Sequence, residues 1–318
     1  MNNFSYFFLS LLLFCSLPTK ATTWDEPWQE TIIKEAEHFV LAVVTEADEA
    51  KGIEVNILDD FSGKLQQKQI KINGFYLLRF CSRSAGHGPE FNFDKLDTCY
   101  FFLKETADGD FAISTPTSGY AYYSTGKVMA TYRHSYHQAL VDQEIYENSM
   151  QAIFNHYHEI AYDTVWVKDY ISTNLSQAPT EAMFLFFSQH VALEMIYHLK
   201  LRYELAFIEP FVNFESFHAN VSGLRALYAN PAPIVKEKFI AFIKDEKRDP
   251  FAKVIAVWGL GKIGLDSCSK KELKTLSQIA KKEKKDYDSG FGGNIMDPRV
   301  CTHFPDLKSA LNKLLGIE

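Results

Sequence analysis

The sequence lacks the short motifs that mark the commonest catalytic sites. It has no Gly-x-Ser-x-Gly turn for a nucleophilic serine, no glycine-rich phosphate loop and no dinucleotide fingerprint. It also lacks the His-Glu-x-x-His arrangement of metalloproteases and the Cys-x-x-Cys spacing of zinc or redox sites. We therefore expect a protein without a cofactor and favour binding over catalysis.

Long apolar segments are also scarce, and the only one lies at the N-terminus. Residues 5–17 are almost uninterruptedly apolar, and a stretch of small and polar residues follows them. The run is too short for a permanent membrane anchor, which needs about 20 apolar residues, and Ala21 offers a cleavage site. We predict that residues 1–21 are a signal peptide, although residues 1–4 contain no Lys or Arg. The mature protein is then secreted, periplasmic or part of the cell envelope, without a transmembrane segment.

The sequence has fewer basic than acidic residues. Without residues 1–21 the chain has 32 Lys and Arg against 40 Asp and Glu, a net charge of −8. Proteins that bind nucleic acids generally carry a basic face that displaces counterions. The only dense basic run, Lys270 to Lys285, is interleaved with acidic residues and is typical of a solvated helix surface. We therefore expect no nucleic acid partner.

The mature chain has four cysteines: Cys81, Cys99, Cys268 and Cys301. An even number of cysteines in an oxidising compartment indicates disulfides. Three pairings are possible, and we favour Cys81 with Cys99 and Cys268 with Cys301, because each pair lies within one expected domain. Four free, buried thiols are the alternative.

Residues 22–133 carry the signals of β-strands. Residues 39–45 are apolar and β-branched, and residues 53–58 alternate apolar and polar side chains. Asn73-Gly74 and Asp108-Gly109 supply turn dipeptides between strand-like runs. Five or so short strands with frequent turns predict a small barrel or sandwich.

The order of these segments resembles the netrin-like OB barrel of the tissue inhibitors of metalloproteinases. The similarity rests on the segments 39–44, 53–64, 77–81 and 97–104 and covers about a third of the chain. It implies an N-terminal OB-like β-barrel. Inhibitors of that family chelate the zinc of their target with an N-terminal cysteine, whereas this chain would begin near Thr22, so the resemblance does not imply that mechanism.

Helical periodicity replaces the strand pattern further along the chain. Residues 134–180 form a transition that we expect to be a helical linker region, and residues 181–318 follow the helical period throughout. Val221–Leu227 and Val254–Leu260 align at an offset of 33 residues, and a weaker copy lies at 193–199.

Each of the two aligned segments precedes another amphipathic stretch, so the repeated unit is a helix pair that must stack on a neighbour. This part resembles HEAT-like repeats, with Gly259 and Gly261 where helices pack closely. The expected fold class is a multidomain α+β protein, with an OB-like β-barrel followed by an all-α HEAT-like helical repeat domain.

The ten histidines are the natural place to look for a site. His190, Glu194 and His198 are spaced four residues apart and share one side of a helix, a geometry that metal ligation can use. The alternative is that His198 belongs to the core and forms a hydrogen bond with Glu194 one turn earlier.

Two further histidine pairs flank the expected boundary between barrel and helices. His134 and His137 lie three residues apart, and His156 and His158 lie two apart. These pairs could converge at the junction, where ligand pockets are common. Helix caps, hydrogen bonds between domains and exposed loops explain the same residues equally well.

Together these patterns predict an exported, non-catalytic protein that binds another protein through a helical-repeat surface and a β-barrel. An alternative from another class is a metal-dependent hydrolase with a histidine site at the domain junction, drawn from His156, His158, His190 and His198. A third is a protease inhibitor that acts through the barrel.

Overall fold

The computed structural model describes residues 27–48, 51–74, 93–134, 137–230, 233–283 and 305–317. The predicted signal peptide, the strand expected after Asn73-Gly74, Cys81 and Cys301 lie outside the described residues. The strands are β1 (His38–Asp48), β2 (Gly52–Asp60), β3 (Gln69–Asn73), β4 (Thr98–Glu105), β5 (Phe111–Ala112), β6 (Tyr120–Ser124), β7 (Lys127–Ala130) and β8 (Ala139–Asp142).

The α-helices are α2 (Gln29–Glu35), α4 (Gln143–Tyr157), α5 (Thr164–Leu175), α6 (Met183–Leu199), α7 (Leu205–Asn213), α8 (Phe217–Leu227), α9 (Pro233–Lys244), α10 (Pro250–Ile263), α11 (Lys270–Lys282) and α13 (Leu307–Leu315). A short 3₁₀ helix, η2 (Leu265–Ser267), follows α10. In the part of the chain that the structure describes, no helix is both long and apolar enough to cross a membrane.

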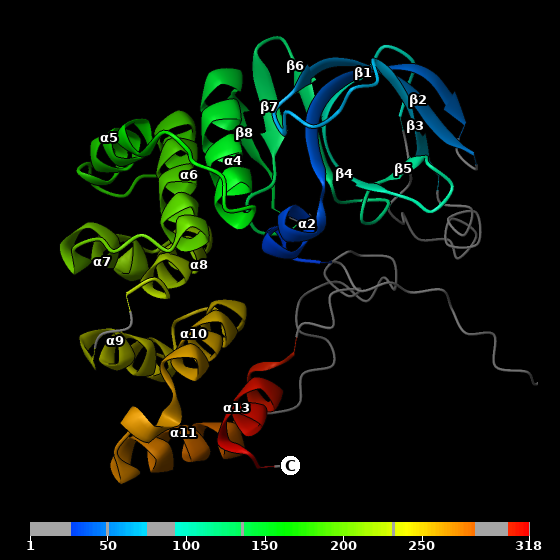
Figure 1. Cartoon of the computed structure of the whole chain (residues 1–318). Helices are drawn as coiled ribbons and strands as arrows, with labels where there is room; N and C mark the ends of the chain where they lie inside the picture. Colours follow the sequence, from blue (N-terminus) through cyan, green and yellow to red (C-terminus); the bar gives the residue numbers. More distant parts are fainter. Residues whose placement is uncertain are drawn as a thin grey trace, which may run out of the picture.

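Strands β1 to β5 close into a barrel (Figure 1). Their order is β1-β2-β3-β5-β4, and β4 pairs back with β1. All neighbours are antiparallel except β3 and β5. The predicted N-terminal barrel is thus confirmed, and its connectivity is consistent with the OB-like barrel that we expected.

Strands β6, β7 and β8 extend the sheet outward from β4 and were not predicted. β8 lies within residues 134–180, which we had expected to be helical. The predicted turn at Asp108-Gly109 does join β4 to β5, and Gly109 has a φ of +83°, a conformation that favours glycine.

Strands β1 and β4 are buried on both of their faces. Their successive side chains point alternately to the two faces. On β1, Val40 and Val44 point into the barrel, whereas Phe39 points outward. On β4, Phe101 points inward and Phe102 outward, where its ring stacks on Phe39 with the centroids 4.7 Å apart. The barrel therefore has an apolar interior and a second, aromatic face on its outside.

Helix α4 covers this aromatic face of the barrel. Phe154 and Tyr146 of α4 lie with their ring centroids 6.0 and 6.3 Å from that of Phe39. One continuous set of buried side chains then runs from this face through α4 and the later helices, while the barrel interior forms a separate core. The barrel and the helices consequently share a core and form one body.

The helices after α4 form pairs that follow one another in a column beside the barrel (Figure 1). α5 packs on α6, α7 on α8, α9 on α10 and α11 on α13. The second helices of the pairs also contact one another in turn: α6 with α8, α8 with α10 and α10 with α13. The predicted change from a barrel to a helical region is thus confirmed.

The segments that align in the sequence occupy α8 and α10, and their weaker copy lies in α6. We expected each copy to pair with the amphipathic stretch that follows it. That pairing was wrong for both α8 and α10, since α9 packs on α10 and α11 packs on α13. The repeated helix is therefore the second member of each pair, and the three copies form consecutive layers of the same side of the column.

Gly259 lies at a tight contact between helices, as its sequence context predicted. A Cβ atom there would lie 2.4 Å from a ring carbon of Tyr228 and 2.5 Å from one of Phe239. At Gly261 the nearest atom would be a methyl carbon of Leu314, 3.3 Å away. Only Gly259 is therefore required by the packing, and Gly261 sits at a looser contact.

Candidate functional site at the junction of barrel and helices

Glu194 of α6 is completely buried where the helices meet the end of the sheet. Its Oε2 accepts a hydrogen bond from Arg225 Nε at 2.9 Å, and its Oε1 accepts one from Ser222 Oγ at 2.8 Å. Arg133 Nε lies 3.9 Å from Oε1. Burial raises the pKa of Glu194, and Arg225, Arg133 and Ser222 oppose that rise. Both oxygens of this carboxylate are thus already held by donors of the protein.

Arg225 connects this carboxylate to the N-terminal helix α2. Its Nη2 lies 3.4 Å from Glu30 Oε2, and Tyr197 donates its hydroxyl to Glu30 Oε1 at 2.6 Å. Burial raises the pKa of Glu30, but Arg225, His198 and Tyr197 outweigh it and lower the pKa to about 2. Burial lowers the pKa of Arg225, and the two glutamates raise it well above its usual value. The network therefore fastens α2 to α6 and α8.

Sequence analysis missed both Glu30 and Arg225. The two residues are 195 positions apart, so no local spacing relates them. The guanidinium carbon of Arg225 lies 3.7 Å from the ring centroid of Tyr197 and 5.0 Å from that of Trp28. The available signal was that Arg225 is the one arginine or lysine in α8, which contains no acidic residue.

Three imidazoles lie close together beside this network. The ring centroid of His137 is 4.6 Å from that of His190 and 4.4 Å from that of His218. Burial and then Arg133 lower the pKa of all three, that of His218 to about 4. The three rings are therefore neutral near pH 7.

His190 has a defined tautomer. Its Nδ1 lies 2.9 Å from Ser222 Oγ, and Ser222 donates its own proton to Glu194. Ser222 must then accept the proton of Nδ1, which leaves Nε2 of His190 as a bare acceptor. That Nε2 and Nδ1 of His137 are buried without a hydrogen-bond partner among the described residues.

A small cavity adjoins His190 and His218, with Phe186, Phe211 and Ser222 also in its lining. Its free space holds about one water molecule. A water there would satisfy the unpaired Nε2 of His190. The cavity is too small for an organic substrate.

Of the two predicted histidine pairs, His137 is the one member that the described contacts place among other imidazoles. It contacts His190 and His218, whereas the His134 ring makes a T-shaped contact with Trp28, with the centroids 5.4 Å apart. His158 lies instead against α2, where its Nε2 is 3.0 Å from the carbonyl oxygen of Ile33.

His156 and His198, the remaining predicted histidines, lie on α4 and α6. The ring of His156, at the end of α4, packs against those of Tyr157 and Tyr162. His198 Nε2 donates to the carbonyl oxygen of Tyr132 at 2.7 Å, and its Nδ1 accepts from the hydroxyl of Tyr157 at 3.0 Å. Burial and Arg225 lower the pKa of His198 to about 4, although Glu30 opposes the change. His198 is thus a neutral histidine of the core with both nitrogens satisfied.

Three lysines surround the junction on its exposed side; we call Lys34, Lys200 and Lys262 the lysine surface. They come from α2, from the end of α6 and from α10, and all three are exposed. Lys262 Nζ lies 4.7 Å from the ring centroid of Tyr228 and 5.1 Å from that of Tyr197.

The lysines are close enough to influence one another. Partial burial lowers the pKa of Lys262, Glu30 opposes it, and Arg225, Lys34 and Lys200 lower it further. Across the described ranges, none of the three lysines forms a salt bridge within 4.0 Å. The lysine surface therefore carries positive charge that the described residues do not pair.

The two cysteines that the structure describes form no disulfide with each other or with any other described residue. Cys99 points into the barrel interior, and Cys268 is half-buried after η2. Their expected partners, Cys81 and Cys301, lie outside the described residues, so the disulfide pairing stays a prediction.

Within the described ranges, one set of three ligand-type side chains brings its donor atoms within 4.8 Å of one another: Glu37, His38 and Glu105. It lies at the rim of the barrel, away from the helical junction. It contains none of the metal candidates that the sequence offered, which were His156, His158, His190, Glu194 and His198.

Comparison of the chain with protein-family models, curated proteins and solved structures finds no match. Its function must therefore be argued from its own residues.

Proposed function

We propose that this chain is an exported, non-catalytic binding protein in which an OB-like barrel is joined to HEAT-like helical repeats, and that its partner is an acidic segment of another protein. One observation carries this proposal. Lys34, Lys200 and Lys262 converge from three separate elements onto one exposed surface without a carboxylate partner among the described residues.

The chemistry of this surface favours a protein carboxylate as the ligand. Like charges that lie close together repel one another, and an anion that binds among them relieves the repulsion. The rings of Tyr157, Tyr197 and Tyr228 lie beneath the lysines, and tyrosine is enriched at the centres of protein interfaces. An acidic, partly apolar segment would satisfy both the charges and the rings.

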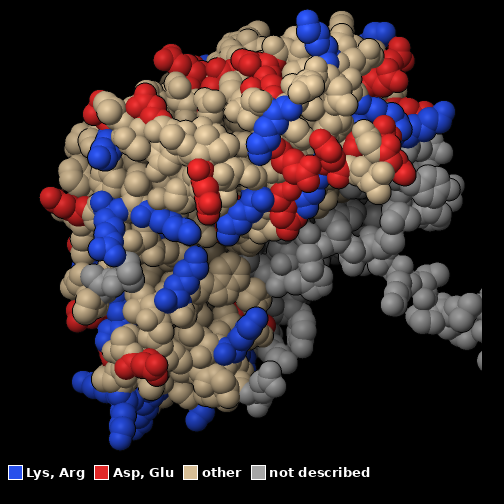
Figure 2. All heavy atoms as spheres, in the orientation of Figure 1, with Lys and Arg blue, Asp and Glu red and all other residues tan. Residues whose placement is uncertain are grey.

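The distribution of charge over the chain supports the same partner. Residues 181–318 contain 20 Lys and Arg against 17 Asp and Glu, whereas residues 22–180 contain 12 against 23. Figure 2 shows Lys and Arg side chains spread over the helical column and groups of Asp and Glu side chains over the barrel. Such a field steers an acidic partner toward the helices and away from the barrel.

The two finer parts of the assignment have separate support. Helix pairs whose second members stack in turn support a HEAT-like repeat. The closed order β1-β2-β3-β5-β4 with one parallel contact supports an OB-like barrel. The apolar run at residues 5–17 supports export.

The test compares two triple variants of the full chain. The first variant inverts the charge of the lysine surface and combines Lys34→Glu, Lys200→Glu and Lys262→Glu. The second makes the same charge change on exposed residues of α11 and combines Lys270→Glu, Lys271→Glu and Lys274→Glu. Fluorescence anisotropy with a labelled glutamate- and tyrosine-containing peptide should show at least about tenfold weaker binding for the first variant. Equal binding by both variants, or none by the unmodified chain, would contradict the proposal.

A further inference from the structure

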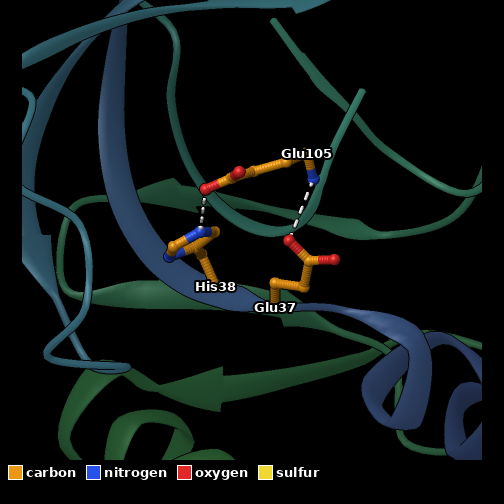
Figure 3. Close-up of side chains that lie close together, drawn as sticks. All are labelled: Glu37, His38 and Glu105. Carbon is orange, nitrogen blue, oxygen red and sulfur yellow. Dashed lines mark hydrogen bonds and ion pairs between the residues drawn. The ribbon is translucent and has the colours of Figure 1, made fainter. Parts of the chain in front are cut away.

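The rim of the barrel brings together a histidine and two glutamates, which we call the rim site: Glu37, His38 and Glu105. Glu37 immediately precedes β1, His38 begins it, and Glu105 ends β4. Figure 3 shows the side chains of His38 and Glu105 turned toward each other, with Glu37 beside them. His38 Nε2 is 3.3 Å from Glu105 Oε1, and the His38 side chain is only 6% exposed.

The other nitrogen of His38 bears on the state of the ring. Its Nδ1 lies 3.4 Å from Ser62 Oγ, and Ser62 donates its proton to the carboxylate of Asp60. In the tautomer whose Nδ1–H donates to Ser62, the neutral ring carries a bare lone pair on Nε2, which faces the carboxylate oxygen of Glu105. Two acceptors at this distance need a positive species between them. In the other tautomer, Nε2–H itself donates to Glu105.

We infer that the rim site binds one divalent transition-metal ion of the Zn²⁺ class through His38 Nε2 and the carboxylates of Glu37 and Glu105. Imidazole nitrogen favours zinc and its neighbours in the transition series over Ca²⁺ and Mg²⁺, and carboxylates complete such sites. Two ligands bound at about 2.1 Å to a tetrahedral ion are about 3.4 Å apart. The separation of His38 Nε2 and Glu105 Oε1 matches that value.

The surroundings of the rim site support an ion rather than a lysine as the counter-charge. In the described part of the chain, Glu37 has no salt bridge and Glu105 has one only with His38. Lys104, the nearest lysine in the sequence, pairs with Glu35 instead. The chain His38–Ser62–Asp60 acts as an outer shell that orients the ring, as is usual for histidine ligands. Both glutamates are exposed, so an ion can enter and water can complete its coordination.

The competing occupant of the contact is a proton on Nε2 of His38, in the neutral ring or in the imidazolium ion, which would donate to Glu105. Isothermal titration of the untagged full chain with Zn²⁺, and separately with Ca²⁺, distinguishes the two. We expect one Zn²⁺ per chain, with affinity reduced about tenfold or more in Glu105→Gln and Glu37→Gln. Glu35→Gln removes a carboxylate from the same rim without touching the site and should bind as the unmodified chain does.

A second readout does not depend on the glutamate variants. Nitrogen NMR of His38 in the presence of Zn²⁺ should show a metal-bound Nε2 and a protonated Nδ1. A proton on Nε2 of His38 in that sample, with or without one on Nδ1, would overturn the inference. So would the absence of Zn²⁺ binding by the unmodified chain, or equal affinity in Glu105→Gln.

Discussion

Arg225 and Glu194 form an ion pair that is closed to solvent: Arg225 Nε lies 2.9 Å from Glu194 Oε2, and their side chains are 3% and 0% exposed. Arg225 also reaches Glu30 on α2, so the pair belongs to a network that joins the start of the chain to α6 and α8. A buried charge that loses its partner is costly, because no water replaces the lost contact.

Replacing Arg225 with Met should therefore lower the free energy of unfolding by about 3–5 kcal/mol, since two buried carboxylates lose their counter-charge. Urea unfolding followed by circular dichroism measures the change. Lys236→Met is the control, because Lys236 pairs with Glu272 in a partly exposed position and should cost less than about 1 kcal/mol. Equal costs for the two variants would show that the buried network contributes little.

The stability of the protein should fall as the solution is acidified below pH 6.5. The pKa of His198 is lowered from 6.5 to about 4 by burial and Arg225, so the unfolded chain takes up a proton before the folded chain does. Between these two values, this histidine alone raises the unfolding equilibrium constant about tenfold per pH unit. His137, His190 and His218, beside Arg133, change in the same direction.

Urea unfolding at several pH values between about 7 and 5 measures this dependence. Glu30 does not contribute in that window, because its unfolded pKa of 4.5 and its folded pKa of about 2 both lie below it. The variant His218→Gln removes one of the titrating groups and should flatten the profile. An unchanged slope in that variant would contradict the assignment.

Gly259→Ala should destabilise the protein although alanine is the better helix former. The new methyl group would lie 2.4 Å from the Tyr228 ring, which cannot move away easily because the Tyr228 hydroxyl donates to the carbonyl oxygen of Ile255. Overpacking of this kind costs about 1–3 kcal/mol. Gly261→Ala, with its nearest atom 3.3 Å away, should be neutral or gain up to about 1 kcal/mol in thermal unfolding.

Export is tested by the N-terminus of the protein recovered from the producing cells. Cleavage after Ala21 would leave Thr22 as the first residue, and N-terminal sequencing of the secreted or envelope fraction should find it there. Recovery of a chain that still begins at Met1, in the cytoplasmic fraction, would contradict this prediction.

Periodicity predicted the elements whose patterns are local. The strand at 53–58 alternates apolar and polar residues, α6 and α10 are long and mainly apolar, and Pro250 stands at the start of α10 with Asp249 capping it. Strands β6 to β8 escaped prediction because they are short, so that an alternation of apolar and polar residues hardly shows in them. Their pairing depends on β4, which no local pattern reveals.

The candidate sites were predicted less well for the same reason. His137 does lie among other imidazoles at the junction, and His190 and Glu194, four residues apart on α6, are both buried. The partners that decide their chemistry, Arg133, Arg225 and Ser222, lie on other elements. The rim site likewise joins the start of β1 to the end of β4, 67 positions apart.

The aromatic outer wall of the barrel sets a limit on how this protein can be divided. Phe39 and Phe102 of this aromatic face are covered by α4. A fragment that ended with the strands would expose this apolar surface to water and would aggregate. We therefore do not expect the barrel or the helices to fold as separate domains. A gene fusion that moved the barrel alone would have to supply a substitute for α4. This requirement favours inheritance of the barrel and the helices together.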